Sequence, residues 1–311
     1  MRALREKFRR NHDLLVVLGP TASGKTGLAV KLAGALEGEI ISADSRQVYR
    51  GMDLGTGKDL DEYARGKETI PYHLIDIIDP ADEFNLFDYH TLFGACFRKI
   101  RGRGKTPILA GGTGLYLDSV LRGYRLPAVP VNEKLREDLE HLDIDALRQR
   151  LRNLSTKQHN SSDLQQRARL IRAIEIAVVM NTDPSFPAPP LILSPFVIGI
   201  RVERAVLRER ITGRLAQRME AGMVDEVLRL HERGISWERI DAFGLEYRYV
   251  ARYLQGNITE AAMLAVLETK IHQFAKRQET WFRGMARKGV PIHWIEGPDE
   301  DAALSLIEAD T

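Results

Sequence analysis

The chain has 311 residues, of which 44% are hydrophobic and 28% are charged, as is usual for a globular protein of one large or two smaller domains. Its single cysteine, Cys96, excludes an internal disulfide and a zinc site built from cysteines, and no apolar run reaches the roughly 18 residues of a membrane-spanning helix. A net charge of +2 permits binding to a polyanion without requiring it. We therefore expect a cytoplasmic, monomeric enzyme that does not associate with a membrane.

Short apolar runs alternate with helical patterns over the first part of the chain. The run at residues 14–18 ends at Gly19-Pro20, and residues 26–36 then carry apolar side chains at helical spacing. Strands that alternate with helices indicate a parallel sheet flanked by helices, the α/β class. The strands predicted in this part of the chain are residues 14–18, 39–43, 73–78 and 106–110.

The pattern changes after Tyr124. Residues 133–180 contain no strand-like run and indicate several helices, and the proline-rich segment 183–190 is typical of a semi-rigid linker. A strand is predicted again at 196–202, followed by helices and a last short strand near 290–295. We therefore predict an α/β catalytic core made of residues 1–125 and 191–311, with an all-helical insertion at 126–190.

Residues 19–26 match the pattern G-x-x-x-x-G-K-[ST] at every fixed position. In such a loop the backbone N–H groups point at phosphate oxygens, Lys25 adds a positive charge, and the Thr26 hydroxyl can hold Mg²⁺. The loop alone does not separate ATP-binding kinases and ATPases from transferases that eliminate diphosphate. The predicted diphosphate or nucleotide site comprises Gly19, Pro20, Thr21, Ala22, Ser23, Gly24, Lys25 and Thr26.

Polar residues follow two other predicted strands. Asp44 comes directly after the strand at 39–43, and Thr113 follows the strand at 106–110 within a glycine-rich turn. Because the carboxyl ends of parallel strands face the ligand, we expect both side chains near the phosphate loop. Asp44 could hold a metal or accept a proton from a nucleophile, and an aspartate that caps the next helix is an equally supported alternative.

Two later segments carry cations. Arg167, Arg169 and Arg172 lie at near-helical spacing and could contact RNA phosphates, although a solvated helix face with a salt bridge to Glu175 is favoured by spacing alone. In residues 274–283, the aromatic side chains of Phe274 and Trp281 are expected in the core, and the cations between them could line a surface for a polyanion.

Taken together, these residues resemble the tRNA dimethylallyltransferase (tRNA isopentenyltransferase) family. The resemblance runs in order from about residue 14 to 295, and as a set its motifs are highly specific. The matching segments are the loop at 19–26, residues 42–53, His73-Leu74-Ile75-Asp76, residues 111–116, Arg169 to Glu175, and Lys276-Arg277-Gln278 through Trp281.

The resemblance implies a P-loop NTPase-like fold and a reaction. Dimethylallyl diphosphate would give its prenyl group to the exocyclic amine of an adenosine beside the anticodon, with Mg²⁺ and the phosphate loop neutralising the diphosphate. Asp44 would bind the amine and take its proton, Thr113 would lie beside the leaving group or the target nucleotide, and Arg214 would lie near the diphosphate. Ser45, Arg46 and Gln47 would grip the flipped-out base. Arg169 and Arg172 would contact the tRNA anticodon stem-loop from the insertion.

The chain departs from the family's pattern in three places. Gly55-Thr56-Gly57-Lys58-Asp59 stands where the family has Gly-Thr-Ala-Lys-Pro, and Gly244-Leu245-Glu246-Tyr247-Arg248 replaces a Gly-Tyr-Lys/Arg-Glu segment. The Asn-Asp-Pro that usually precedes the two arginines is absent from residues 160–167, and Ala168 replaces a glutamine. The residues of the expected chemistry match, whereas parts expected to face RNA are altered.

Three other functions are compatible with parts of the pattern. An adenylate isopentenyltransferase would use a free adenine nucleotide, but such an acceptor needs no arginine-bearing insertion. A small-molecule kinase would transfer phosphate from ATP, and a non-catalytic RNA-binding P-loop protein would show no turnover with any diphosphate donor.

Overall fold

The computed structural model describes residues 1–65, 68–154, 166–182 and 191–310. The chain forms two compact units, one of Met1–Gly123 with Ile192–Thr311 and the other of Tyr124–Leu191. The proline-rich segment 183–190 and residues 160–165, which hold part of one departure from the family's pattern, lie outside the described residues. Within the described part, no helix combines the length and the apolar character needed to span a membrane.

The larger unit is built on a parallel six-stranded sheet in the order β5-β2-β6-β1-β7-β8. The register aligns Leu18 of β1 with Gly111 of β6, and Gly111 with Ala43 of β2. The loops that leave these three strands therefore begin at the same edge of the sheet. The strands are β1 (Leu14–Leu18), β2 (Gly38–Ala43), β5 (Tyr72–His73), β6 (Thr106–Gly111), β7 (Pro195–Arg201) and β8 (Ile292–Glu296).

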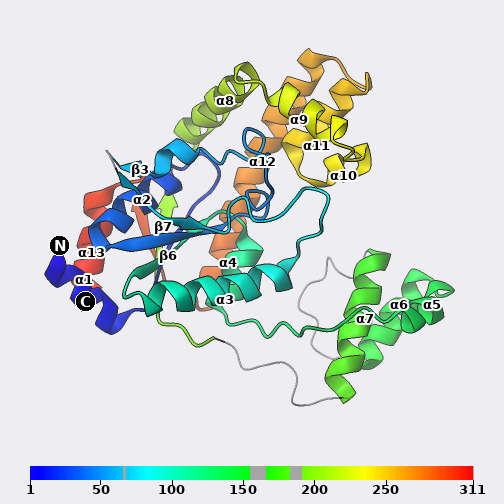
Figure 1. Cartoon of the computed structure of the whole chain (residues 1–311), viewed down its shortest axis with the longest axis horizontal. Coiled ribbons are helices and arrows are strands. Elements are labelled where there is room, and N and C mark those ends of the chain that lie inside the picture. Colours follow the sequence, from blue (N-terminus) through cyan, green and yellow to red (C-terminus); the bar gives the residue numbers. More distant parts are fainter. Residues whose placement is uncertain (66–67, 155–165, 183–190, 311) are drawn as a thin grey trace. The chain divides into compact units, whose positions relative to one another are not determined.

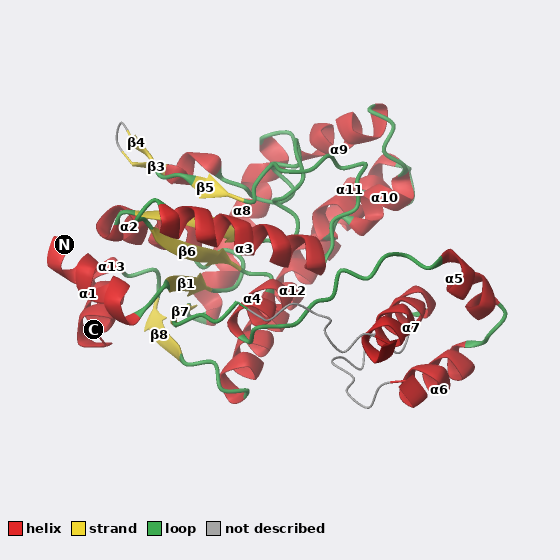
Figure 2. Cartoon of the chain, turned by 60° about the horizontal axis from the view of Figure 1, so that its bottom comes forward, coloured by secondary structure: helices red, strands yellow, loops and turns green. Residues whose placement is uncertain are grey.

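Helices cover the sheet because its strands are apolar on both faces. One core joins alternate strand residues such as Leu15 and Val17 to α1 (Arg2–Asn11), α2 (Lys25–Leu36) and α13 (Glu300–Asp310). Helix α3 (Leu86–Gly102) packs against β2 and β6, and its Tyr89 ring stacks on Tyr116 of α4 (Gly114–Leu121) with centroids 3.8 Å apart. Figure 2 shows these helices flanking the strands.

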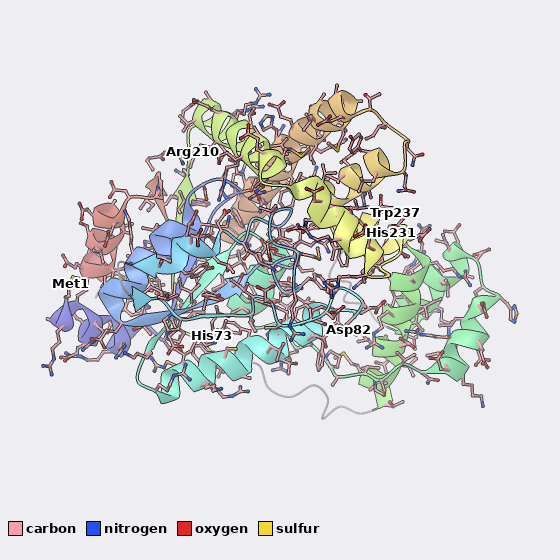
Figure 3. The ribbon with its side chains drawn as sticks, turned by 45° about the horizontal axis from the view of Figure 1, so that its top comes forward. Met1, His73, Asp82, Arg210, His231 and Trp237 are labelled. Atoms are coloured by element: carbon pink, nitrogen blue, oxygen red, sulfur yellow. The ribbon has the colours of Figure 1, made fainter. Side chains whose placement is uncertain are left out.

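Five further helices of the larger unit share a second core and gather in one bundle (Figure 1). In this bundle the rings of His231 and Trp237 stack with their centroids 3.8 Å apart, where one helix follows another (Figure 3). The helices are α8 (Arg204–Glu220), α9 (Met223–Glu232), α10 (Trp237–Ala242), α11 (Leu245–Leu254) and α12 (Glu260–Arg287).

The smaller unit is helical in its described residues and has a core of its own. It contains α5 (Glu133–Glu140), α6 (Ile144–Leu154) and α7 (Arg167–Thr182). Its buried residues are Leu139, Leu147, Leu151, Leu170, Ile174 and Ala177.

The predicted strand at 73–78 is largely wrong, because β5 ends at His73. Leu74 and Asp76 have φ angles of 63° and 55°, in the left-handed region that ends a strand. The chain turns there, and the Asp76 N–H donates to the Gln47 carbonyl, 3.0 Å away. The segment that follows β5 thus supports the loop after β2. Before β5 the chain forms the short helix η1 (Leu60–Tyr63) and an antiparallel pair of short strands, β3 (Ala64–Arg65) and β4 (Glu68–Thr69).

Candidate active site

The phosphate loop joins β1 to α2. Gly24 has a φ of 82°, a conformation that favours glycine, and it directly precedes the first residue of α2. The Lys25 ammonium lies 3.3 Å from the Pro20 carbonyl, so this side chain folds back over the loop. Lys25 and Thr26 are half-buried at the start of the helix, where backbone N–H groups favour an anion.

A side chain from α12 fixes the loop, and the sequence patterns did not single out this role. The Gln278 Oε1 accepts the Thr21 N–H at 2.9 Å, while its Nε2 donates to the Gly112 carbonyl at 2.9 Å. Gln278 is buried and thereby ties the loop after β1 to the loop after β6. Because the sequence separation is 257 residues for one bond and 166 for the other, no local pattern could reveal the contact.

Asp44 and Thr113 meet beside this loop, as the strand order predicts. One oxygen of Asp44, Oδ1, accepts the Arg46 N–H at 2.8 Å and the Gln47 N–H at 3.4 Å. The Thr113 Oγ1 accepts the Ser45 N–H at 3.0 Å, and the Thr113 N–H donates to the Ala43 carbonyl. Asp44 therefore caps the turn that follows β2 rather than a helix, and it does so through Oδ1 alone in these bonds.

The other expected acceptor-binding residues extend from the same turn. The Gln47 side chain donates through Nε2 to the Gly57 carbonyl at 3.1 Å and accepts from the Ser42 hydroxyl at 3.2 Å. Ser45, Arg46 and Gln47 are half-buried. The structure thus brings these residues together with Asp44 and Thr113.

Cations and carboxylates surround Lys25. Burial lowers the pKa of Lys25 to about 8; the charges of Asp44 and Glu62 act in the opposite sense, and those of Arg214 and Arg218 lower it further. Arg214 on α8 forms an ion pair with Asp59, and its Nη2 lies 3.6 Å from the Glu62 Oε1. Burial raises the pKa of Glu62, which also accepts a backbone hydrogen bond from Gly27 of α2. Asp59 and Glu62 therefore hold the arginine that was expected at the diphosphate.

The comparison with family models covers most of the chain. A model described as IPP transferase matches residues 47–285, and a model described as isopentenyl transferase matches residues 12–74. The first match alone includes well over half of the chain. The chain belongs to the IPP transferase family.

Curated relatives and solved structures agree with this assignment. The chain is 56% identical over 302 residues to a tRNA dimethylallyltransferase 2 of Citrifermentans bemidjiense, covering 97% of this chain and 96% of the relative. It is 53% identical over 303 residues to a tRNA dimethylallyltransferase 1 of Syntrophus aciditrophicus, covering 96% and 98%. The solved tRNA isopentenylpyrophosphate transferase of Bacillus halodurans is 33% identical, with a TM-score of 0.67 and coverage of 96% and 95%. The predicted family and its P-loop NTPase-like α/β fold are therefore confirmed.

Two buried charged residues support the family's motifs, and the sequence patterns did not predict this role for either. Lys58 forms ion pairs with Asp53 and Asp76 and donates to the Tyr49 carbonyl at 2.8 Å. Glu226 of α9 accepts the N–H groups of three successive residues, 53–55, at 2.7–3.0 Å. Lys58 lies in the altered segment at residues 55–59, whereas nothing in the spacing marks Glu226.

Within the helical unit, the two expected tRNA-contacting arginines differ. The Arg172 Nη1 lies 3.0 Å from Oε2 of the buried Glu175, and its Nη2 donates to the Val129 carbonyl at 2.6 Å. The salt bridge considered as an alternative for this helix face is therefore present. Arg169 is exposed on the same helix.

The prediction that Phe274 and Trp281 belong to the core is wrong, because they are 40% and 39% exposed. The Trp281 ring packs against the backbone at Gly114, where a Cβ would lie 2.4 Å from the ring. The Arg277 guanidinium lies 5.9 Å from the centroid of the Phe274 ring. Between these two exposed rings on the same helix, the polar Gln278 is buried.

The phosphate loop suits a Mg²⁺ ion that is held by few protein oxygens. Among the described residues, no group of three or more His, Cys, Asp or Glu side chains could hold a metal by itself. Mg²⁺, however, commonly takes one or two protein oxygens and completes its shell with substrate phosphates and water. The half-buried Thr26 hydroxyl next to Lys25 provides such an oxygen.

Proposed function

We propose that this chain transfers a dimethylallyl group from dimethylallyl diphosphate to the exocyclic amine of an adenosine beside the tRNA anticodon. The family and the two named relatives, both tRNA dimethylallyltransferases, support this function. The observation that carries it is the meeting of the phosphate loop, Asp44 and Thr113 at three aligned strand ends. One loop suits a diphosphate, and a carboxylate that can take a proton lies beside it.

In this reaction a bond forms between the amine nitrogen and the prenyl carbon, while the bond from that carbon to the diphosphate oxygen breaks. The second oxygen of Asp44 accepts the amine proton, and Oδ1 keeps the turn closed through the Arg46 and Gln47 amides. Lys25, Arg214 and the loop N–H groups stabilise the charge that develops on the diphosphate. Mg²⁺ held by Thr26 and the diphosphate would add to this stabilisation when bound.

The same proposal assigns the tRNA contacts to two parts of the chain. Ser45, Arg46 and Gln47 grip the flipped-out base, since the amine must leave the stack before it reacts. Arg169 contacts the backbone of the anticodon stem-loop from the helical unit. Arg172 contributes there chiefly by holding that unit together, because Glu175 and Val129 already bind its guanidinium.

The experiment that tests this function compares Asp44→Asn with Asp44→Ala in a host that lacks the modification. An asparagine keeps an oxygen for the Arg46 and Gln47 amides but cannot take the proton. We expect mass spectrometry of tRNA nucleosides to show dimethylallyladenosine with the wild-type chain and with Asp301→Asn, an exposed control. Both Asp44 variants should lose it, with turnover in vitro down on the order of 100-fold or more.

The outcomes separate the alternatives. Normal modification with Asp44→Asn would show that Asp44 only caps the turn. Prenylation of AMP in preference to tRNA in side-by-side assays would identify an adenylate isopentenyltransferase instead. Phosphate transfer from ATP without a prenyl donor would identify a kinase.

A further inference from the structure

Two of the segments that depart from the family's pattern meet at one side chain, Arg218 of α8. The Arg218 guanidinium occupies the space beside Gly57 so closely that a Cβ at that position would overlap it. Its Nη1 also lies 4.0 Å from Oε1 of Glu246, in the second altered segment. An alanine at position 57, as the family's pattern has there, would exclude the guanidinium from this place.

Arg218 follows Arg214 by four residues, so the two side chains project from the same face of α8. Arg214 reaches Asp59 and Glu62, and Glu62 is hydrogen-bonded by Gly27 at the start of the phosphate-loop helix. Arg218 reaches Gly57, whose carbonyl accepts from Gln47. The pair of arginines therefore spans from the phosphate loop to the turn that Asp44 caps.

The surroundings of Arg218 keep its charge available. Its side chain is 17% exposed and that of Glu246 is 19% exposed. Burial raises the pKa of the Glu246 carboxyl, and the charge of Asp44 acts in the same sense. At 4.0 Å the pair is loose, and it engages only one of the guanidinium nitrogens, although a guanidinium has five N–H donors. The positive charge of Arg218 contributes to the lowered pKa of Lys25.

We propose that Arg218 is a second diphosphate-binding guanidinium, which joins Arg214 at the phosphate loop and is positioned by Gly57 and Glu246. The proposal rests on the proposed function for the identity of the donor. It assigns the changes at Gly57 and Glu246 to the donor side of the reaction rather than to tRNA recognition. The glycine makes room for the guanidinium, and the glutamate holds it beside the site.

The test measures binding of inorganic diphosphate by calorimetry, together with KM for dimethylallyl diphosphate and for tRNA. Arg218→Met should weaken diphosphate binding and raise the donor KM by about five- to twentyfold, with the tRNA KM within about twofold of wild type. Arg210→Met is the matched control, since Arg210 is an exposed arginine of the same helix (Figure 3), and it should bind diphosphate as the wild type does.

Gly57→Ala supplies the second arm. It should displace the guanidinium and weaken diphosphate binding at least as much as Arg218→Met does, because the φ of 61° at Gly57 also strains an alanine there. The double variant should then bind diphosphate no more weakly than Gly57→Ala alone. Thermal unfolding of each variant shows whether the fold is intact, and Arg218→Lys should restore part of the affinity.

Several results would overturn the proposal. Wild-type diphosphate affinity in a folded Arg218→Met protein would do so, and so would a change confined to kcat or to the tRNA KM, which would indicate a structural or an RNA-binding role. Additive losses in the double variant would show that Gly57 acts independently. If the wild-type chain bound diphosphate but did not prenylate tRNA, the proposed function would fail while the calorimetric arm still decided this one.

Discussion

At the scale of single residues, Lys25 shows how the fold alters a side chain that the motif already marks. The consensus predicts a fully charged ammonium, whereas burial lowers its pKa to about 8. Near pH 7 most of the population is still protonated and can bind an anion. As the pH rises through 8, the free protein loses this proton, and a bound diphosphate must then restore it.

We predict that diphosphate affinity of the wild-type chain falls with pH above 8, approaching about tenfold per pH unit at the alkaline end. Calorimetry between pH 7 and 9.5 in buffers of different ionisation enthalpy should show proton uptake on binding. The Lys25→Met variant shares the ionisation of the ligand itself but lacks this uptake, so the difference between the two proteins isolates Lys25. Identical pH profiles for both proteins would contradict the prediction.

At the scale of elements, α12 acts on the site from a great distance along the chain. Gln278 holds the loops after β1 and β6 through one acceptor and one donor. The amide is suited to this because it offers both groups, while a carboxylate would face the Gly112 carbonyl and an alkyl group would satisfy neither loop. A buried polar group left without its partner costs about 1–3 kcal/mol.

We predict that Gln278→Leu lowers the free energy of unfolding by about 1–3 kcal/mol and weakens diphosphate binding, because Thr21 and Gly112 lose their partner. Gln278→Glu should retain only the bond from Thr21. Its free energy of unfolding and its diphosphate affinity should therefore lie between those of the wild type and of Gln278→Leu. Denaturant unfolding and calorimetry measure both effects, with Gln273→Leu as an exposed control on the same helix. Unchanged diphosphate binding by a folded Gln278→Leu protein would show that the clamp does not serve the loop.

At the scale of the whole molecule, the two units have separate cores and separate charged centres. In the helical unit, Glu175 accepts from Arg172, from the Asn132 N–H at 3.0 Å and from Arg136 through both carboxylate oxygens at 2.9 and 3.3 Å. Burial would raise the pKa of Glu175, but the hydrogen bonds from Arg136, Asn132 and Arg172 outweigh it and leave the pKa below its usual value. This stabilisation is present at neutral pH and is lost as the pH falls through that lowered pKa.

We predict that Glu175→Gln destabilises the helical unit by about 1–3 kcal/mol and raises the KM for tRNA, while diphosphate binding by the larger unit stays unchanged. Hydrogen exchange should become faster in residues 133–154 and 167–180 relative to wild type. Glu137→Gln, at an exposed position on α5, is the control. If Glu175→Gln weakened diphosphate binding as much as it raised the KM for tRNA, the two units would not act independently.

The sequence by itself determined the class of fold, the family and the phosphate loop. Apolar runs mark strands whatever their partners, and the loop from Gly19 to Thr26 acts through its own backbone, so both are local properties. The position of Asp44 beside Thr113 also followed, because strand ends of a parallel sheet share an edge. Local spacing misled where burial depends on distant partners, as it did for Phe274, Trp281 and the segment after His73.

Only the tertiary structure decided which distant side chains support the phosphate loop and residues 53–57. Gln278, Glu226 and Arg218 come from helices more than 150 residues away in the sequence, and their contacts depend on how those helices pack. The same packing explains why Gly57 and Glu246, which both lie in altered segments, are neighbours of one arginine, Arg218. A sequence lists such changes separately, whereas the free energy of a contact depends on the distance between its atoms.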